Sequence, residues 1–215
     1  MDIDTTVKAL PLTQADIERI VTEICSIKLE DNVIFAITNI ETIMDDFDYP
    51  GVRVHLEAYL DKLKQPIKID VSTDDVITPD AIEYEYKLMF EDRTINLNTY
   101  NVETMLAEKS QTIINRGIAN TRMRDFYDIY ELLKHTTFSW NTAKEAFIAT
   151  CKKRDNIFTI EKIEAELEQI SQNENLKNQW EMFSKKNFYV EDLNYVDLIA
   201  EVCSAIKKIS QSTTR

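Results

Sequence analysis

The hydrophobic pattern of this chain changes its period near residue 100, and that change limits the folds open to it. Apolar residues alternate over 52–60 and again over 67–71, which predicts two half-buried strands joined by a turn at 62–66. From Val102 onward the apolar residues recur at helical spacing. We therefore expect an α+β protein in which sheet residues come first and helices follow.

Local signals support this division. Thr13 and Asp16 form a capping box before a helical pattern, and 33–37 and 84–90 read as further short strands. Gly117 is placed to end the first helix of the later part. Two more helices are expected to begin after Ser139 and Thr159, and a last one to run over about 192–209.

The chain shows no linker between its two kinds of pattern. It has 215 residues, of which only Gly51 and Gly117 are glycine, and no Pro-, Ser- or Gly-rich stretch divides it. This size suits one large domain or two small ones. We expect a mixed α/β domain over 1–100 that packs directly against a helical domain over 101–215.

Composition describes an ordinary soluble protein, with 44% hydrophobic and 29% charged residues. No apolar run is long enough for a transmembrane helix and no secretory signal opens the chain, so we expect a cytoplasmic protein with no membrane partner. Cys25, Cys151 and Cys203 lie far apart in apolar helical stretches and are expected to be buried thiols. His55 falls on the polar side of its strand, where a solvated or surface-paired role is expected.

The net charge of −13 argues against general nucleic-acid binding, but it is unevenly distributed. Residues 1–100 hold 9 Lys and Arg against 21 Asp and Glu, whereas 101–215 hold 16 against 17. The stretch 109–124 carries four basic residues and no acid. An acidic half and a local basic strip suit a divalent metal and a phosphate, although a chance cluster on a solvated face would look the same.

Three aspartates have the pattern of a metal site. Asp2 and Asp4 flank Ile3, so on a strand both carboxylates share one face, where they repel each other unless a cation lies between them. Asp70 stands on the polar side of the strand 67–71. Three carboxylates brought together could hold two Mg²⁺ ions for a phosphoryl-type transfer. The alternative is a set of acidic residues on a solvated strand face.

A second polar cluster lies in the helical part. Lys109 is on one predicted helix, and Asp125 and Asp128, three residues apart, share a face of the next. Lys109 could bring a positive charge to a triphosphate, and Asp125 could orient that lysine or contact the base or sugar. Alternatively, both aspartates are acids that the helix dipole favours in a first turn.

Four segments, in this order, carry a resemblance to a known family: MDID, GVRVHLEAYLDKLKQPIKIDV, ETMLAEK and NTRMRDFYDIYELL. They resemble the AbiEii/AbiGii toxins, which are nucleotidyltransferases of bacterial type IV toxin–antitoxin and abortive-infection systems. The resemblance spans residues 1–135, and RMRDFYDIY is its most specific part.

The resemblance implies a polymerase-β-like nucleotidyltransferase domain, a mixed sheet with flanking helices, followed by an α-helical bundle. It implies Mg²⁺-dependent transfer of a nucleotide from an NTP to an RNA, which in some members is the 3′ end of tRNA. A cognate antitoxin is implied as a functional partner that need not bind directly. The implied metal ligands are Asp2, Asp4 and Asp70, the catalytic residues Asp70, Lys109 and Asp125, and the nucleotide- or acceptor-binding residues Lys109, Arg122, Arg124 and Asp128.

The sequence departs from the family pattern at its start. The family places a Gly-Gly or Gly-Ser turn and a helix before the acidic pair, where backbone N–H groups hold the triphosphate. Here Asp2 follows Met1 directly, so we expect a truncated member. The alternative to an enzyme is then a catalytically inactive remnant that acts as a binding or regulatory protein. A third hypothesis is an acidic module that docks a basic protein partner.

Overall fold

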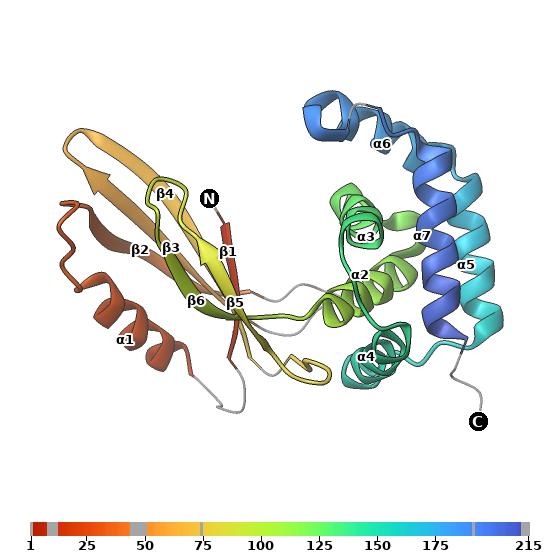
Figure 1. Cartoon of the computed structure of the whole chain (residues 1–215), viewed down its shortest axis with the longest axis horizontal. Coiled ribbons are helices and arrows are strands. Elements are labelled where there is room, and N and C mark those ends of the chain that lie inside the picture. Colours follow the sequence, from red (N-terminus) through yellow and green to blue (C-terminus); the bar gives the residue numbers. More distant parts are fainter. Residues whose placement is uncertain (1, 8–12, 44–50, 74, 191, 212–215) are drawn as a thin grey trace. The chain divides into compact units, whose positions relative to one another are not determined.

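The computed structural model describes residues 2–7, 13–43, 51–73, 75–190 and 192–211. Contacts between residues divide the chain into two compact units, Met1–Asp75 and Val76–Arg215, and each is described by itself (Figure 1). The sequence predicted a domain boundary near residue 100, and this is where the helices of the second unit begin. The strands of the first unit are β1 (Asp2–Val7), β2 (Ile34–Ile43), β3 (Gly51–Leu60) and β4 (Leu63–Thr73), with one helix, α1 (Gln14–Cys25).

The first unit is a four-stranded mixed sheet in the order β1-β4-β3-β2. β1 runs parallel to β4, whereas β2, β3 and β4 pair antiparallel. The predicted capping box is confirmed, since the Thr13 side chain accepts from the N–H of Asp16 and the Asp16 carboxylate accepts from that of Thr13. α1 covers one face of the sheet, where its Ile17 and Val21 join a buried cluster.

Strand alternation decides which face of the sheet is the core. Val52, Val54 and Leu56 are buried against α1, so the residues between them stand on the opposite face. The described part of this core is small, with six buried apolar residues. The polar face is therefore built by the same pattern that builds the core.

The turn between β3 and β4 is shorter than the sequence predicts. Leu60 pairs with Leu63, so that Asp61 and Lys62 alone form the turn, and Asp61 has a positive φ of 50°. The predicted turn at 62–66 is wrong, because Pro66 lies within β4, opposite Glu57. Among the described pairs, β1 pairs with β4 from Lys68 onward, so the proline lies outside that part of the ladder.

The second unit contains a two-stranded hairpin and the helices. The hairpin strands are β5 (Ile82–Lys87), which overlaps the strand expected at 84–90, and β6 (Thr94–Thr99), which the sequence did not predict. The helices are α2 (Val102–Arg116), η1 (Gly117–Ala119), α3 (Met123–His135), α4 (Trp140–Lys153), α5 (Ile160–Gln172), α6 (Glu174–Lys186), η2 (Phe188–Val190) and α7 (Tyr195–Ser210).

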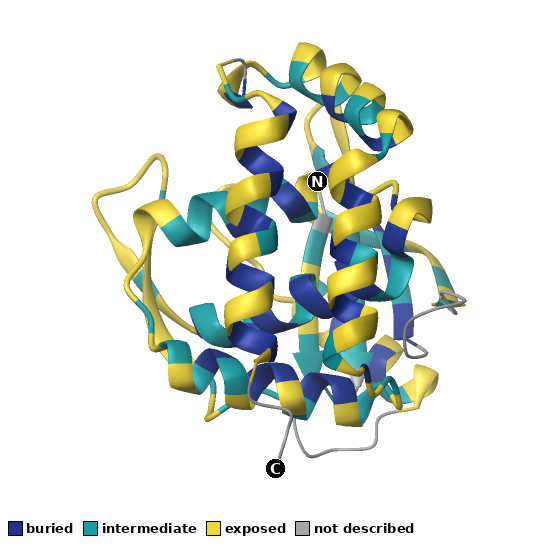
Figure 2. Cartoon of the chain, turned by 90° about the vertical axis from the view of Figure 1, so that its right-hand side faces the viewer, coloured by how far each residue is buried: buried dark blue, intermediate teal, exposed yellow. Residues whose placement is uncertain are grey.

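The helices of the second unit enclose one large hydrophobic core. Figure 2 shows buried and exposed residues alternating along them, as expected for amphipathic helices. The largest buried side chain is Trp180 of α6, whose indole N–H donates to the carbonyl of Leu193. Ser139 and Thr159 are confirmed as N-caps of α4 and α5. Of the cysteines, Cys151 is buried and burial raises its pKa to about 12, whereas Cys25 and Cys203 are half-buried.

The elements confirm the expected α+β class, with a mixed sheet and a flanking helix followed by a helical bundle. No helix in the described ranges is both long and apolar enough to span a bilayer.

Candidate active site

The polar face of the sheet carries Asp4 beside Asp70. β1 places Asp4 opposite Asp70 of β4, and β3 places Arg53 opposite Asp70 from the other side. Residues paired across neighbouring strands project from the same face of a sheet. The three residues therefore form a row across three strands, on the face away from α1.

The guanidinium of Arg53 donates two hydrogen bonds to the Asp70 carboxylate. Its Nε donates to Oδ1 at 2.7 Å and its Nη2 to Oδ2 at 2.8 Å. Such a bidentate pair is among the stronger side-chain interactions and is strictly oriented. The hydrogen bonds from Arg53 hold the pKa of Asp70 below its ordinary value. Asp70 is thus ionised at neutral pH, and its side chain, 28% exposed, is held in one orientation.

The third member of the predicted triad is placed by its backbone only. Asp2 pairs in register with Lys68, one strand pair along from Asp4 and Asp70. Its side chain lies outside the described part of the structure. The structure therefore brings two of the three predicted metal ligands together.

Asp4 and Asp70 fit a magnesium site in their chemistry, because Mg²⁺ binds carboxylate oxygens. Asp4 is exposed and can turn toward an ion beside Asp70. Among the described residues no three His, Cys, Asp or Glu side chains come together in a metal-binding group, so a three-carboxylate site would need Asp2 as well. Arg53 is the one departure, since an ion at Asp70 would share or displace its hydrogen bonds.

A further carboxylate lies at the far end of the same face. Thr6 donates to Oδ2 of Asp75 at 2.7 Å, and the Ser72 hydroxyl donates to the same oxygen. Thr6 and Ser72 are each two residues beyond Asp4 and Asp70 on their strands, so all four share one face. Sequence reasoning did not single out Asp75, because it lies outside both strands.

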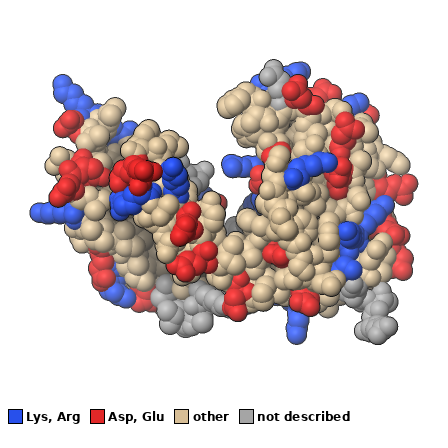
Figure 3. All heavy atoms as spheres, in the orientation of Figure 1, with Lys and Arg blue, Asp and Glu red and all other residues tan. Residues whose placement is uncertain are grey.

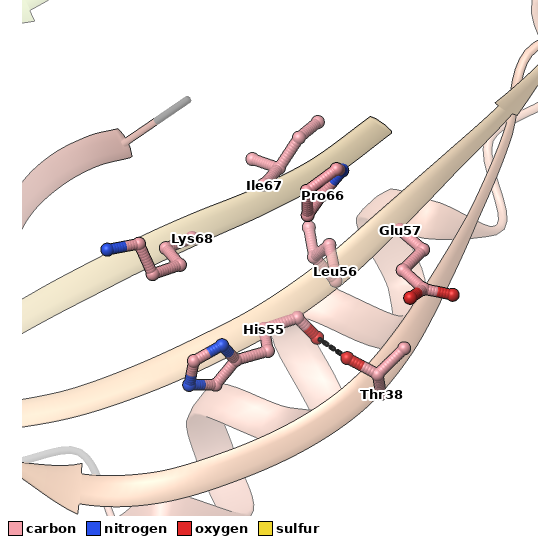
Figure 4. Close-up of a pocket in the computed structure, with 7 residues that line it drawn as sticks. All are labelled: Thr38, His55, Leu56, Glu57, Pro66, Ile67 and Lys68. Atoms are coloured by element: carbon pink, nitrogen blue, oxygen red, sulfur yellow. Dashed lines mark hydrogen bonds between the residues drawn. The ribbon is translucent and has the colours of Figure 1, made fainter. Parts of the chain in front are cut away.

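A small pocket opens further along the same face (Figure 4). It has a volume of about 290 Å³ and is lined partly by His55 and Lys68, which are paired across β3 and β4. His55 lies 3.0 Å from a carboxylate oxygen of Glu41, a surface pairing of the kind that its place on the polar face predicts. The pocket is lined by ordinary strand residues and holds no second row of carboxylates.

The second predicted cluster forms within the helical unit. Nζ of Lys109, on α2, lies 3.1 Å from Oδ1 of Asp125 and 2.7 Å from Oδ2 of Asp128, both on α3. The Lys109 side chain is 25% exposed. Burial alone would lower the pKa of Lys109, but the charges of Asp125 and Asp128 outweigh it and raise that pKa. Lys109 is therefore a fixed positive charge between two helices.

Arg122 and Arg124 stand at the start of α3. Arg122 is the N-cap residue, its N–H donates to the side-chain oxygen of Asn120, and its own side chain is exposed. Arg124 is also exposed, and its Nε lies 3.8 Å from Oδ1 of Asp128. Both can reach an anionic ligand that approaches Lys109 from solvent.

Gly117 sets the turn that brings α2 and α3 together. It is the predicted C-terminal residue of α2, with a φ of +51° and a ψ of −133°, a conformation that glycine alone adopts readily. A Cβ at this position would collide with a carboxylate oxygen of Glu166.

We expect Gly117→Ala to lower the free energy of unfolding by about 2 kcal/mol, mainly through backbone strain, since the end of the flexible Glu166 side chain can move aside. Urea unfolding would measure the change. In the double variant, Glu166→Ala added to Gly117→Ala should restore only the part of the lost stability that the collision causes. Full restoration of the free energy of unfolding would show that the backbone is not strained.

The charges outside these clusters are mixed. Figure 3 shows carboxylates lying among Lys and Arg side chains on the visible face of each unit. The net charge of the first hundred residues is therefore not gathered into one acidic patch on that face. The candidate charged clusters are Asp4–Asp70 in the first unit and Lys109–Asp125–Asp128 in the second.

Comparison with known proteins identifies the family. The model of the nucleotidyl transferase AbiEii toxin family, of the type IV toxin–antitoxin systems, matches residues 1–202. The chain belongs to the AbiEii family. No curated protein matches it. As an AbiEii protein it is a nucleotidyltransferase of a toxin–antitoxin system.

Two solved structures from Helicobacter pylori are similar to this AbiEii protein. One is a candidate nucleotidyltransferase with 15% sequence identity and a TM-score of 0.43, covering 98% of this chain and 77% of its own. The other, JHP933, also has 15% identity, with a TM-score of 0.41, covering 98% of this chain and 75% of its own.

Arg53 is the site residue of this AbiEii protein that sequence reasoning missed. It stands on the polar face of the predicted strand 52–60, and so the face was predictable. Its partner was not, because a turn at 62–66 would pair residue 53 with a position beyond β4. The signal that could have found it is a two-residue turn at Asp61 and Lys62, which sets Arg53 opposite Asp70.

Proposed function

We propose that this AbiEii protein transfers a nucleotide from an NTP to an RNA acceptor and needs Mg²⁺ to do so. The observation that carries the proposal is the register of β1 and β4, which sets Asp4 beside Asp70 on the polar face of the sheet. Two carboxylates in this position provide the ligands that a metal-dependent phosphoryl transfer requires. The 3′ end of a tRNA is the acceptor that we propose.

Each residue of the first unit has a proposed part. Asp2, Asp4 and Asp70 hold the metal, and Asp70 also accepts a hydrogen bond from the attacking hydroxyl of the acceptor and increases its nucleophilicity. When bound, Mg²⁺, with two ions proposed, would neutralise the charge of the triphosphate. Arg53 keeps Asp70 ionised and oriented before the substrates arrive.

The helical unit supplies the positive charge. Lys109 contacts the triphosphate, and Asp125 holds the lysine in place. Arg122, Arg124 and Asp128 contact the nucleotide or the backbone of the acceptor. We propose a cytoplasmic site of action, because NTP and RNA are found together there, and a cognate antitoxin that acts without needing to touch this protein.

One observation favours a second candidate, a catalytically inactive binding or regulatory protein. Arg53 already satisfies both oxygens of Asp70, so the pair is electrically neutral and structurally complete as it stands. A protein of this kind would keep the fold and bind no metal at Asp70.

Metal removal tests the proposal. Purified protein, RNA and each radioactive NTP are incubated with Mg²⁺, and labelled RNA is expected with at least one NTP. An excess of EDTA is expected to abolish the label, because the phosphate charges then lack a counter-ion. Calorimetry with NTP and Mg²⁺ separates the candidates: an inactive protein would give neither label nor saturable heat.

A further inference from the structure

The helical unit exposes two neighbouring aromatic side chains just after α6. Phe188 is 87% exposed and Tyr189 is 48% exposed, and both belong to η2. Their rings meet edge to face, with centroids 5.7 Å apart. We call this pair the Phe188–Tyr189 platform. Neighbouring exposed aromatic side chains are candidates for an interaction site.

The platform packs against other aromatic side chains of the helical unit. The Tyr189 ring lies 5.4 Å from the ring of Tyr127 on α3, whose hydroxyl donates to the carbonyl of Tyr189. The Tyr127 ring in turn lies 6.5 Å from that of the buried Trp180. Val190, next along η2, is 2% exposed and anchors the segment in the core. The aromatic rings thus form a continuous series of ring contacts from the core to solvent.

Two exposed lysines lie close to the platform along the chain. Lys185 and Lys186 are exposed in the last turn of α6, two and three residues before Phe188. Tyr127 links the platform to α3, where the next residue is Asp128, the partner of Lys109; the carboxylates of Glu131 and Asp128 act on the Tyr127 hydroxyl. Aromatic faces beside lysines are the combination that binds unpaired nucleotides, since every base can stack and every phosphate is anionic.

A comparison within the chain shows that exposure alone is not the signal. Phe90, at the tip of the β5–β6 hairpin, is 94% exposed, but it has no ring contact among the described residues. The charges beside it are already paired, Lys87 with Asp92 and Arg93 with Glu91. The Phe188–Tyr189 platform differs in having both ring support and exposed lysines.

We propose that the Phe188–Tyr189 platform binds the single-stranded end of the RNA acceptor, with one unpaired base stacked on Phe188 and the preceding phosphates beside Lys185 and Lys186. The proposal rests on the proposed function for the identity of the ligand as RNA. Stacking on this side of α3 would place the RNA end next to the helix that carries Asp125 and Asp128.

The test measures RNA binding without catalysis. Fluorescence anisotropy of a labelled short single-stranded RNA is followed in EDTA with no NTP, using the full chain. Phe188→Ala should weaken binding about tenfold, the effect of losing one stacked base. The matched control, Phe90→Ala, removes an equally exposed ring and should bind like the wild type. Phe188→Trp should bind RNA like the wild type, because the larger ring of tryptophan also stacks on a base.

Salt dependence separates the two kinds of contact. Replacing Lys185 and Lys186 by alanine should reduce the slope of log K against log salt by about 1.4, since each lysine–phosphate contact on a single strand releases about 0.7 of a counter-ion. Phe188→Ala should leave the slope unchanged. A blunt duplex RNA should compete poorly, because its bases cannot reach the platform.

Three results would overturn the proposal: equal binding by Phe188→Ala and Phe90→Ala, equal affinity for duplex and single strand, or an effect of Phe188→Ala on self-association in place of RNA binding. Failure of the proposed function is recognised separately. If the protein binds RNA through the platform but never labels it, this inference stands and the proposed function fails. If Phe188→Ala labels RNA as well as the wild type does, the proposed function stands and the platform is overturned.

Discussion

Replacing Asp70 by asparagine is expected to lower the rate of nucleotide transfer at least a hundredfold, because under the proposed function a charge that binds the metal, worth several kcal/mol of transition-state stabilisation, is lost. The amide keeps the shape of the side chain but provides one neutral oxygen to the metal and to the acceptor hydroxyl. Transfer of label from radioactive NTP to RNA, measured under single-turnover conditions, reports the change directly.

The same substitution also disturbs Arg53, and controls must separate the two effects. Arg53→Gln breaks the pair but keeps the carboxylate, so it should retain far more activity than Asp70→Asn. Glu23→Gln removes an exposed carboxylate that pairs with Arg19 on α1, and should leave transfer unchanged. Equal activity of wild type and Asp70→Asn over a range of NTPs and RNAs would show that Asp70 is not a catalytic residue.

Replacing Lys109 by methionine is expected to lower the free energy of unfolding by about 3 kcal/mol, because two partly buried carboxylates lose their common cation. Asp125 and Asp128 are then left beside each other on α3 with Arg124 as a distant, exposed partner. Nucleotide transfer should fall as well, since the triphosphate loses a positive charge. Urea unfolding and the labelling assay measure the two effects independently.

An exposed lysine–glutamate ion pair in the same unit provides the matched control for Lys109. Lys134 lies 3.1 Å from Glu201, but both side chains are more than 40% exposed, so Lys134→Met should cost less than about 1 kcal/mol. Adding Asp128→Asn to Lys109→Met should recover stability but not transfer, because it relieves repulsion without replacing the cation. Recovery of both would assign Lys109 a purely structural role.

Most of the local structure followed from the sequence. Thr13, Ser139 and Thr159 cap their helices as predicted, and Gly117 ends α2, because a cap needs only the side chains next to it. The alternation in β3 predicted which residues face the core. The strand β6 was missed because its apolar residues are few and none is buried, and the helix α6 because Leu176 and Trp180 alone mark its buried side.

The site was predictable as residues but not as contacts. Helical spacing placed Asp125 and Asp128 on one face, and their contact with Lys109 in the structure agrees with that prediction. Asp4 and Asp70 were expected near each other on the evidence of their strands, and the register places them as neighbours. Their roles in binding metal and substrates stay predictions.

What the sequence by itself determined is the order of elements, the caps and the faces of strands and helices, because these depend on residues close along the chain. Only the tertiary structure decided the register of β3 on β4, and with it the pairing of Arg53 with Asp70. A sheet register depends on the number of residues in a turn, and a shift by an even number of residues changes every cross-strand partner while keeping each side chain on the same face.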